Sequence, residues 1–164
     1  MDIKTLIDQY AAYDLWASAR FVDRLQKEPA RVLDQHVKSS FPSLRATLLH
    51  IRDAESAWYM RVTGQPVRWP AEEGTDIGTL IKHTTVMRDF VRGLSVEDLQ
   101  RPISYKTLKG EPFTNPMLPL LMHCFNHASY HRGQVVTMMR QLDLDDVPNT
   151  DLVAYVRLQD KAKV

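Results

Sequence analysis

Three histidines share one short segment, at His123, His127 and His131. A spacing of four residues places neighbouring members about one helical turn apart and nearly on one face. Two neutral imidazoles placed in this way can bind the same transition-metal ion. The outer two lie about 12 Å apart along a helix axis, so one ion cannot take all three. Spacing alone leaves both pairs open, His123 with His127 or His127 with His131.

A catalytic zinc-type site needs a third protein ligand and one open coordination position. His50 is the best candidate, because it precedes the core residue Ile51 at the edge of an apolar stripe. Metal sites in helical bundles are built from side chains on facing helices. His36 falls in a predicted loop, and we expect His83 to face solvent. Ala128 follows His127 where a zinc peptidase of the HExxH type carries a carboxylate, which argues against a peptidase.

Glu55 and Tyr130 are the candidate catalytic residues beside these histidines. Glu55 lies on a core-facing line, where it would either hydrogen-bond a ligand imidazole or form a buried ion pair with Arg132 or another base. Tyr130 flanks His131 and could position a substrate, or it could be exposed and structural. We expect Asp53 to be solvated, and Cys124 to be a buried, inert thiol. Trp16, Trp58 and Tyr59 could line an apolar pocket over the ion, or belong to the core.

The elements that must position these residues follow from apolar side chains at three- and four-residue steps, which are typical of helices with one buried face. Four long helices are predicted: residues 2–27, a stretch from just after Ser40 to Gly64 with Pro42 in its first turn, Asp76 to about Leu94, and Asn115–Pro116 to about Leu142. We therefore predict an all-α, four-helix bundle with long crossover connections.

Minor elements are also predicted: a helical turn opened by a capping box at Ser95, a small hairpin in residues 103–114 that turns at Lys109–Gly110, and a short last helix capped by Thr150 or Asp151. Gly133, inside the fourth long helix, suggests close helix packing at that position.

The 164 residues predict one domain, residues 1–164. Lys and Arg number 21 against 20 Asp and Glu, with no basic cluster, so we expect no nucleic-acid partner. No apolar run approaches the roughly 20 residues that span a bilayer, and no signal peptide is visible, so we expect no membrane association. Together with the single Cys124, these features predict a cytoplasmic protein.

Four segments together resemble the motifs of the DinB/YfiT-like family of metal-dependent bundle proteins. They are distributed from the first predicted helix to the end of the chain: YDLWA at residues 13–17, LLHIRDAE at 48–55, HASYHRGQ at 127–134 and PNTDL at 148–152. The most specific part of the resemblance is a combination of two segments: the histidine pair followed by RGQ, and His50 within LLHIRDAE.

The resemblance implies a four-helix bundle, usually a homodimer, with one divalent ion held by His50, His127 and His131. His123 then lies outside the ligand set, and the ion could be Zn, Ni or Fe. Relatives include transferases and isomerases that use low-molecular-weight thiols; the family is also described as hydrolases, and most members have no assigned reaction.

We therefore expect a metal-dependent enzyme that acts on a small-molecule substrate, of the hydrolase or thiol S-transferase type. The alternatives are a non-enzymatic metal-binding protein, in which the ion joins two helices, and a metal-free homodimeric bundle.

Overall fold

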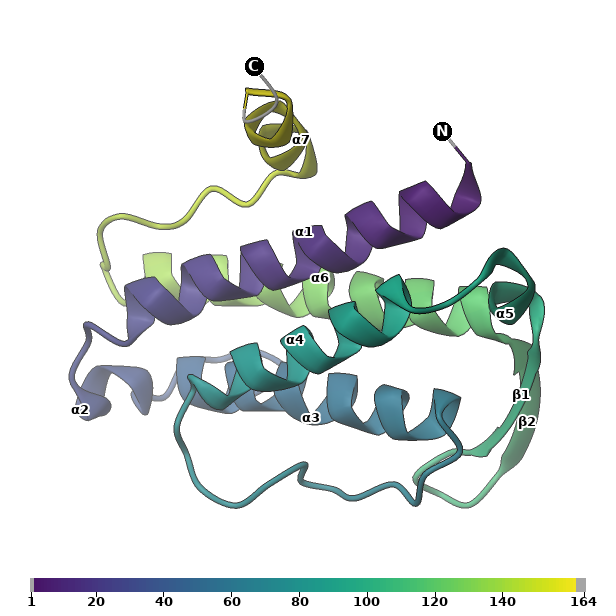
Figure 1. Ribbon diagram of the computed structural model, residues 1–164. Helices are drawn as coiled ribbons and strands as arrows, with labels where there is room; N and C mark the ends of the chain where they lie inside the picture. The colour runs from purple at the N-terminus through teal and green to yellow at the C-terminus, as the bar shows by residue number, and fades with distance from the viewer. Residues whose placement is uncertain (1, 162–164) are drawn as a thin grey trace.

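The four predicted apolar stripes form four long helices in the computed structural model, which describes residues 2–161 (Figure 1). These helices are α1 (Ile3–Leu25), α3 (Leu44–Val62), α4 (Thr79–Arg92) and α6 (Met117–Gln141). The smaller elements are α2 (Ala30–Leu33), α5 (Val96–Gln100), the strands β1 (Pro102–Lys106) and β2 (Pro112–Pro116), and α7 (Leu152–Lys161).

The long helices form a ring in which α1 packs on α4, α4 on α3, α3 on α6 and α6 on α1. Residues 63–78 run back along the whole bundle, so that α3 and α4 point in the same direction (Figure 1). The connection from α4 to α6 does not cross the bundle; α5 and the β1–β2 hairpin lie together at one end of it (Figure 1). The fold is thus an all-α bundle with one long crossover and a small antiparallel hairpin.

Three helices begin later than the sequence pattern predicts. Ser43, and not a residue near Ser40, caps α3 by accepting a hydrogen bond from the backbone N–H of Ala46 at 3.2 Å, which leaves Pro42 outside the helix. Asn115 belongs to β2 and pairs with Ile103, so that α6 begins only at Met117. Asp76 forms a local turn, and α4 begins at Thr79. In each case a competing local hydrogen bond or strand pairing delays the helix.

The capping box at Ser95 and the hairpin with its turn at Gly110 are confirmed. Gly110 has a φ of +86°, a conformation that glycine adopts without strain. The prediction for Gly133 was wrong: this residue is exposed, and no atom of another element lies within 4 Å of where a Cβ would stand.

The core of the bundle has two large apolar parts, one towards α2 and the other towards the hairpin, and a small third cluster joins α1 to α7. Between the two large parts lie buried polar side chains from all four long helices: Asp14 and Ser18 of α1, Glu55 of α3, Thr84 of α4 and Arg132 of α6. Arg132 donates hydrogen bonds to Asp14 at 2.6 Å and to Ser18 at 3.1 Å, which confirms that it pairs with a carboxylate.

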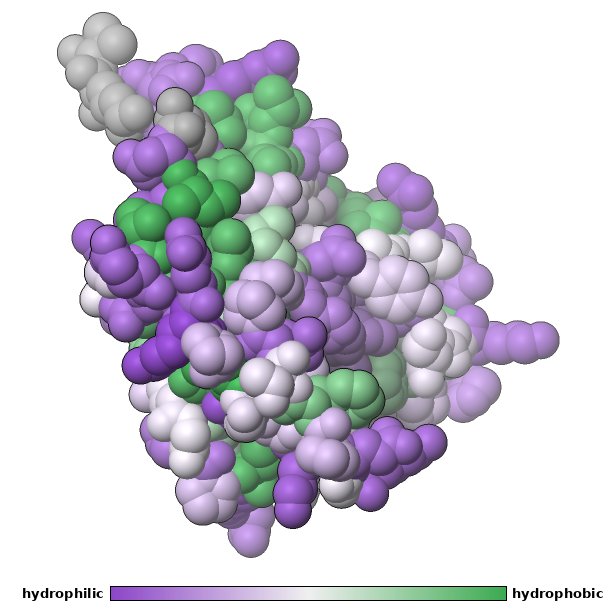
Figure 2. Space-filling model, turned by 90° about the vertical axis from the view of Figure 1, so that its right-hand side faces the viewer, coloured by the Kyte–Doolittle hydropathy of each residue, from purple (hydrophilic) through white to green (hydrophobic). Residues whose placement is uncertain are grey.

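The surface at the hairpin end shows hydrophilic and hydrophobic residues interspersed (Figure 2). Over residues 2–161, each helix is either too short or too polar to cross a membrane.

Candidate metal centre

Three of the six histidines meet between α3 and α6. His50 lies near the middle of α3, and His127 and His131 lie one turn apart on α6, the helix that packs against it. The Nε2 atom of His127 is 3.1 Å from Nε2 of His50 and 3.1 Å from Nε2 of His131. One ring nitrogen from each residue can be chosen so that all three lie within 4.8 Å of one another.

These contacts are poorly explained by hydrogen bonds alone. An imidazole nitrogen offers either one proton or one lone pair, so Nε2 of His127 cannot satisfy two facing nitrogens at once. A single cation can accept all three lone pairs. Two metal–nitrogen bonds of about 2.0–2.1 Å reach across about 4 Å, which accommodates the separations of 3.1 Å. The donor set therefore fits one divalent transition-metal ion.

The protonation state of the histidines also favours metal binding. Burial, followed by repulsion from His131, lowers the pKa of His50 to about 4, while Asp53 opposes this shift. Burial and the three neighbouring histidines lower the pKa of His127 to about 4. Both rings are therefore neutral at neutral pH, with lone pairs free for a metal.

Gln134 orients the third imidazole. Its Oε1 lies 2.8 Å from Nδ1 of His131, which makes Nδ1 the proton donor and leaves Nε2 with a lone pair that faces the other two rings. The side-chain amide of Gln134 in turn donates to the hydroxyl of Ser40 at 2.7 Å. A chain of hydrogen bonds thus connects the histidine to the segment before α3.

Aromatic rings border the three histidines. Phe41 stacks on His50 with ring centroids 4.0 Å apart and also lies 5.5 Å from the ring of His131. Trp69, from the long crossover, meets the edge of His50 at 5.9 Å. Tyr130 lies 5.0 Å from His131, but 63% of it is exposed, so its hydroxyl is available to a ligand from solvent.

Glu55 takes neither of the two roles considered for it. Within residues 2–161, neither carboxylate oxygen has a hydrogen-bond partner, so it contacts no ligand imidazole, and Arg132 pairs with Asp14 instead. Its pKa is raised well above the ordinary value by burial and by the nearby Asp14.

Two neighbouring side chains are also placed by the structure. The expectation that Asp53 is solvated was wrong: it is buried, forms an ion pair with Arg52 at 2.8 Å and accepts a hydrogen bond from the backbone of Ala71. Cys124 is buried, and this burial raises the pKa of its thiol, as expected for an inert cysteine.

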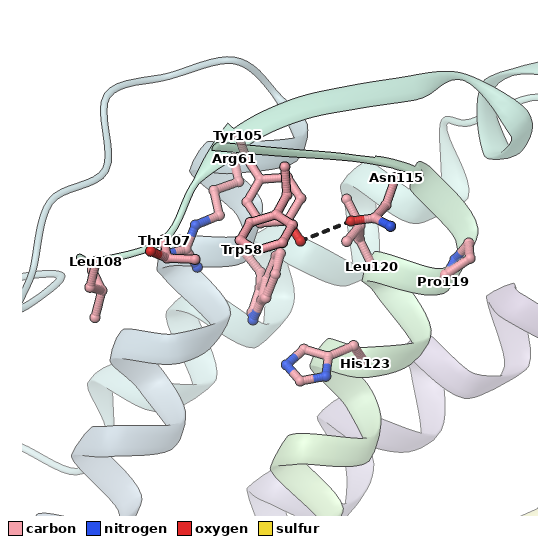
Figure 3. A pocket seen from close by; sticks show the side chains of 10 residues that line it. Trp58, Arg61, Tyr105, Thr107, Leu108, Asn115, Pro119, Leu120 and His123 are labelled. Carbon is pink, nitrogen blue, oxygen red and sulfur yellow. Dashed lines mark hydrogen bonds between the residues drawn. The ribbon is translucent and has the colours of Figure 1, made fainter. Parts of the chain in front are cut away.

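His123 lies one turn before His127 in α6, with its ring centroid 6.1 Å from that of His127. It faces Trp58 at 5.1 Å, in a separate pocket beside the hairpin (Figure 3). The suggested aromatic wall over the ion is not formed by Trp16 or Tyr59, because Trp16 packs on Tyr155 of α7 and Tyr59 on Phe90 of α4.

Sequence reasoning did not identify Phe41, Trp69 or the role of Gln134. Gln134 is three residues after His131 and thus on the same helix face, so its spacing could have revealed it. Phe41 and Trp69 lie in irregular segments, where no periodic pattern links them to the histidines.

Comparisons with known proteins agree with this fold. The profile of the DinB family matches residues 1–163. Protein DinB of Bacillus subtilis (strain 168) is 26% identical over 155 residues, which cover 88% of this chain and 90% of that protein. The crystal structure of a DinB-like protein from Bacillus cereus ATCC 10987 superposes with a TM-score of 0.58 at 21% identity, covering 82% of this chain and 90% of that one. The chain belongs to the DinB family.

Proposed function

We propose that this protein binds one divalent ion (Zn, Ni or Fe) through His50, His127 and His131 and uses it in a reaction on a small molecule. The convergence of three Nε2 atoms on one point carries the proposal, because a shared ion satisfies all three. The burial that keeps His50 and His127 neutral supports it.

Three neutral histidines leave the charge of a divalent ion uncancelled and coordination positions open, so the ion can lower the pKa of a bound water towards about 7 or bind a thiolate. The protein's own residues would orient the three histidines and shield them from solvent. Gln134 keeps the lone pair of His131 directed at the ion. Phe41 and Trp69 restrict water around His50, and the exposed Tyr130 is placed to contact a substrate.

A thiol S-transferase or a hydrolase fits such a site. Both need a nucleophile activated at neutral pH, and neither needs a carboxylate beside the histidines. Glu55 lies in the buried polar layer without a hydrogen bond to any histidine, so we assign it no part in the chemistry.

A non-enzymatic role is the second candidate. The three histidines come from two packed helices, α3 and α6, so a bound ion would join them directly. Within residues 2–161, no carboxylate is hydrogen-bonded to the three histidines, so no side chain there is placed to accept a proton as a general base, which favours this alternative.

Metal content tests the ligand set. We expect untagged protein, purified without chelator, to hold about one equivalent of Zn, Ni or Fe by elemental analysis, and the His127→Ala/His131→Ala variant to hold none. His123→Ala is the matched control on the same helix, and it should keep the ion. Absence of metal, with no uptake when each ion is supplied, would overturn the proposal.

Activity separates the two candidates. The metal-loaded protein should turn over at least one member of a panel of thiol–acceptor pairs, epoxides, esters and amides, and the double variant should not. A protein that binds its ion tightly and turns over nothing in the panel would support the non-enzymatic role.

A further inference from the structure

A pocket of about 490 Å³ lies beside the metal centre, between α3, α6 and the β1–β2 hairpin (Figure 3). Its volume is in the range of small-molecule sites. The walls are mainly aromatic and aliphatic, and the residues that matter for recognition are Trp58, Arg61, Tyr105, Phe113, Leu120 and His123. Phe113 is 49% exposed although it lines this pocket, so the hairpin presents apolar surface that nothing in residues 2–161 covers.

Among residues 2–161, Arg61 is the one lysine or arginine that lines this pocket. Its guanidinium lies 4.7 Å from the ring centroid of Trp58, and its Nε donates to the carbonyl of Lys106 at 3.3 Å. Within residues 2–161, no carboxylate lies at ion-pair distance from it. Partial burial lowers the pKa of Arg61, which means that its charge is less well solvated than that of a surface arginine. An anion would compensate for this lost solvation.

Two further polar side chains stand at the wall. The hydroxyl of Tyr105 donates to Oδ1 of Asn115 at 3.0 Å (Figure 3), and within residues 2–161 the amide NH₂ of Asn115 has no acceptor. The ring nitrogens of His123 make no hydrogen bond within the described part of the chain, and the ring lies beside Trp58. The pocket therefore combines a largely apolar interior with one guanidinium and a few polar groups at its wall.

We propose that this pocket binds a small molecule with a flat apolar body and a carboxylate, whose oxygens accept hydrogen bonds from the guanidinium of Arg61. A planar guanidinium donates two parallel hydrogen bonds to a carboxylate, which a point charge cannot do. The apolar body packs against Trp58, Tyr105 and Phe113.

The same ligand class is the substrate class of the metal centre, and this part of the inference rests on the proposed function. The pocket and the three histidines are adjacent: His123 lines the pocket, and His127, one turn further along α6, faces the other two histidines. A molecule anchored at Arg61 and extending past His123 would bring its far end to the metal. The carboxylate then fixes orientation, and the reaction takes place at the opposite end.

The test compares phenylpropionate with its neutral isostere phenylpropionamide, by calorimetry and by NMR of the Trp58 indole N–H. Both compounds are titrated into metal-free and into zinc-loaded protein. We expect the carboxylate to bind about tenfold more tightly than the amide in both forms, because a hydrogen bond to a charged group is stronger than one to a neutral group. The Trp58 signal should shift with both compounds.

Arg61→Gln should lower the affinity for the carboxylate to that for the amide and leave the amide unchanged. Arg61→Lys, which keeps the charge but not the planar fork, should retain an intermediate preference. Arg31→Gln, a change on the exposed face of α2 at the other end of the bundle, is the matched control and should behave as wild type. Thermal melts establish that each variant is folded.

Equal affinity for the two compounds, or an unchanged preference in Arg61→Gln, would overturn the inference. Binding of the carboxylate only to zinc-loaded protein would also overturn it, because the metal itself would then be the anchor. Failure of the metal proposal has a different signature: the protein takes up no ion, yet phenylpropionate still binds at Arg61.

Discussion

At the residue scale, the most unusual side chain in this protein is Glu55. It is buried among Asp14 of α1, Thr84 of α4, and Arg132 and Cys124 of α6, and neither of its oxygens has a hydrogen-bond partner within residues 2–161. Arg132 is already paired with Asp14 at 2.6 Å. Burial and the nearby charge of Asp14 both disfavour the ionised form of Glu55, and this is why its pKa is raised.

This raised pKa has a consequence for stability. Below the ordinary glutamate pKa of 4.5, the Glu55 carboxyl holds its proton in both the folded and the unfolded state, and it costs no stability. As pH rises above that value, the unfolded chain releases the proton while the folded protein retains it, so stability falls by at most about 1.4 kcal/mol per pH unit. Glu55→Gln replaces the carboxyl group with an amide that does not titrate, so the variant lacks this dependence of stability on pH.

We therefore expect the unfolding free energy of wild type to fall relative to that of Glu55→Gln as the pH rises from 5 to 8. Denaturant unfolding of both proteins across this range measures the difference. Glu73→Gln, in the exposed part of the crossover, is the control and should run parallel to wild type. Parallel curves for Glu55→Gln as well would show that Glu55 is ionised in the folded protein.

Gln134 provides a second test at the same scale. Removing the hydrogen bond to Nδ1 of His131 frees the ring to rotate or to change tautomer, and losses of this kind typically cost 10–100-fold in metal affinity. Gln134→Ala should therefore bind zinc about tenfold or more weakly in a chelator competition. Gln141→Ala, at the exposed end of the same helix, should bind as wild type does. Equal affinities would mean that packing alone holds His131.

At the scale of the elements, α6 combines ligands and packing in one helix. His127, His131 and Gln134 are on the side that faces α3 and the segment before it, while Arg132 points to α1. Gly133 lies between these groups on the exposed face, with open space where a side chain would be. Its effect on the helix is therefore only the cost of backbone entropy.

Gly133→Ala should stabilise the protein by up to about 1 kcal/mol, the difference in helix propensity between the two residues. Gly110→Ala is an informative comparison, because it also enters open space but at a φ of +86°. That variant should be destabilised, since alanine is strained in this conformation. Chemical denaturation of both variants measures the two changes in unfolding free energy, which should have opposite signs. Destabilisation by Gly133→Ala would indicate that this face of α6 is covered in the protein in solution.

At the scale of the whole molecule, an ion held between α3 and α6 as proposed would link metal binding to folding. A metal that binds only the folded state adds about 2.7 kcal/mol at a free concentration one hundred times its Kd. For a protein of this size, that corresponds to a rise in melting temperature of about 5–10 °C.

We expect this rise when zinc is added to chelated wild-type protein, followed by calorimetry, and no rise in the His127→Ala/His131→Ala variant. An unchanged melting temperature at verified saturation would contradict a link between the two helices. The homodimer that the family resemblance implies stays a prediction, which light scattering of the same samples would check.

Sequence patterns were enough to predict the four long helices and the family, although not where each helix begins. Periodic apolar residues predict α1, α3, α4 and α6 because a helix with one buried face must repeat at this spacing, and a capping box or a glycine turn depends only on neighbouring residues. Spacing also limited the metal pair on α6 to two choices. It could not choose between His123 and His131, since both are one turn from His127.

Only the tertiary structure decided which side chains meet. The packing of α3 on α6 brings His50 to His127 and His131 and leaves His123 in the pocket with Trp58. The pairing of Arg132 with Asp14, 118 positions away in the chain, leaves Glu55 without an ion-pair partner among the described residues. The starts of α3 and α6 were misplaced because a cap at Ser43 and the strand pairing of Asn115 compete with helix formation. Contacts of this kind depend on the docking of distant segments, which local sequence periodicity does not encode.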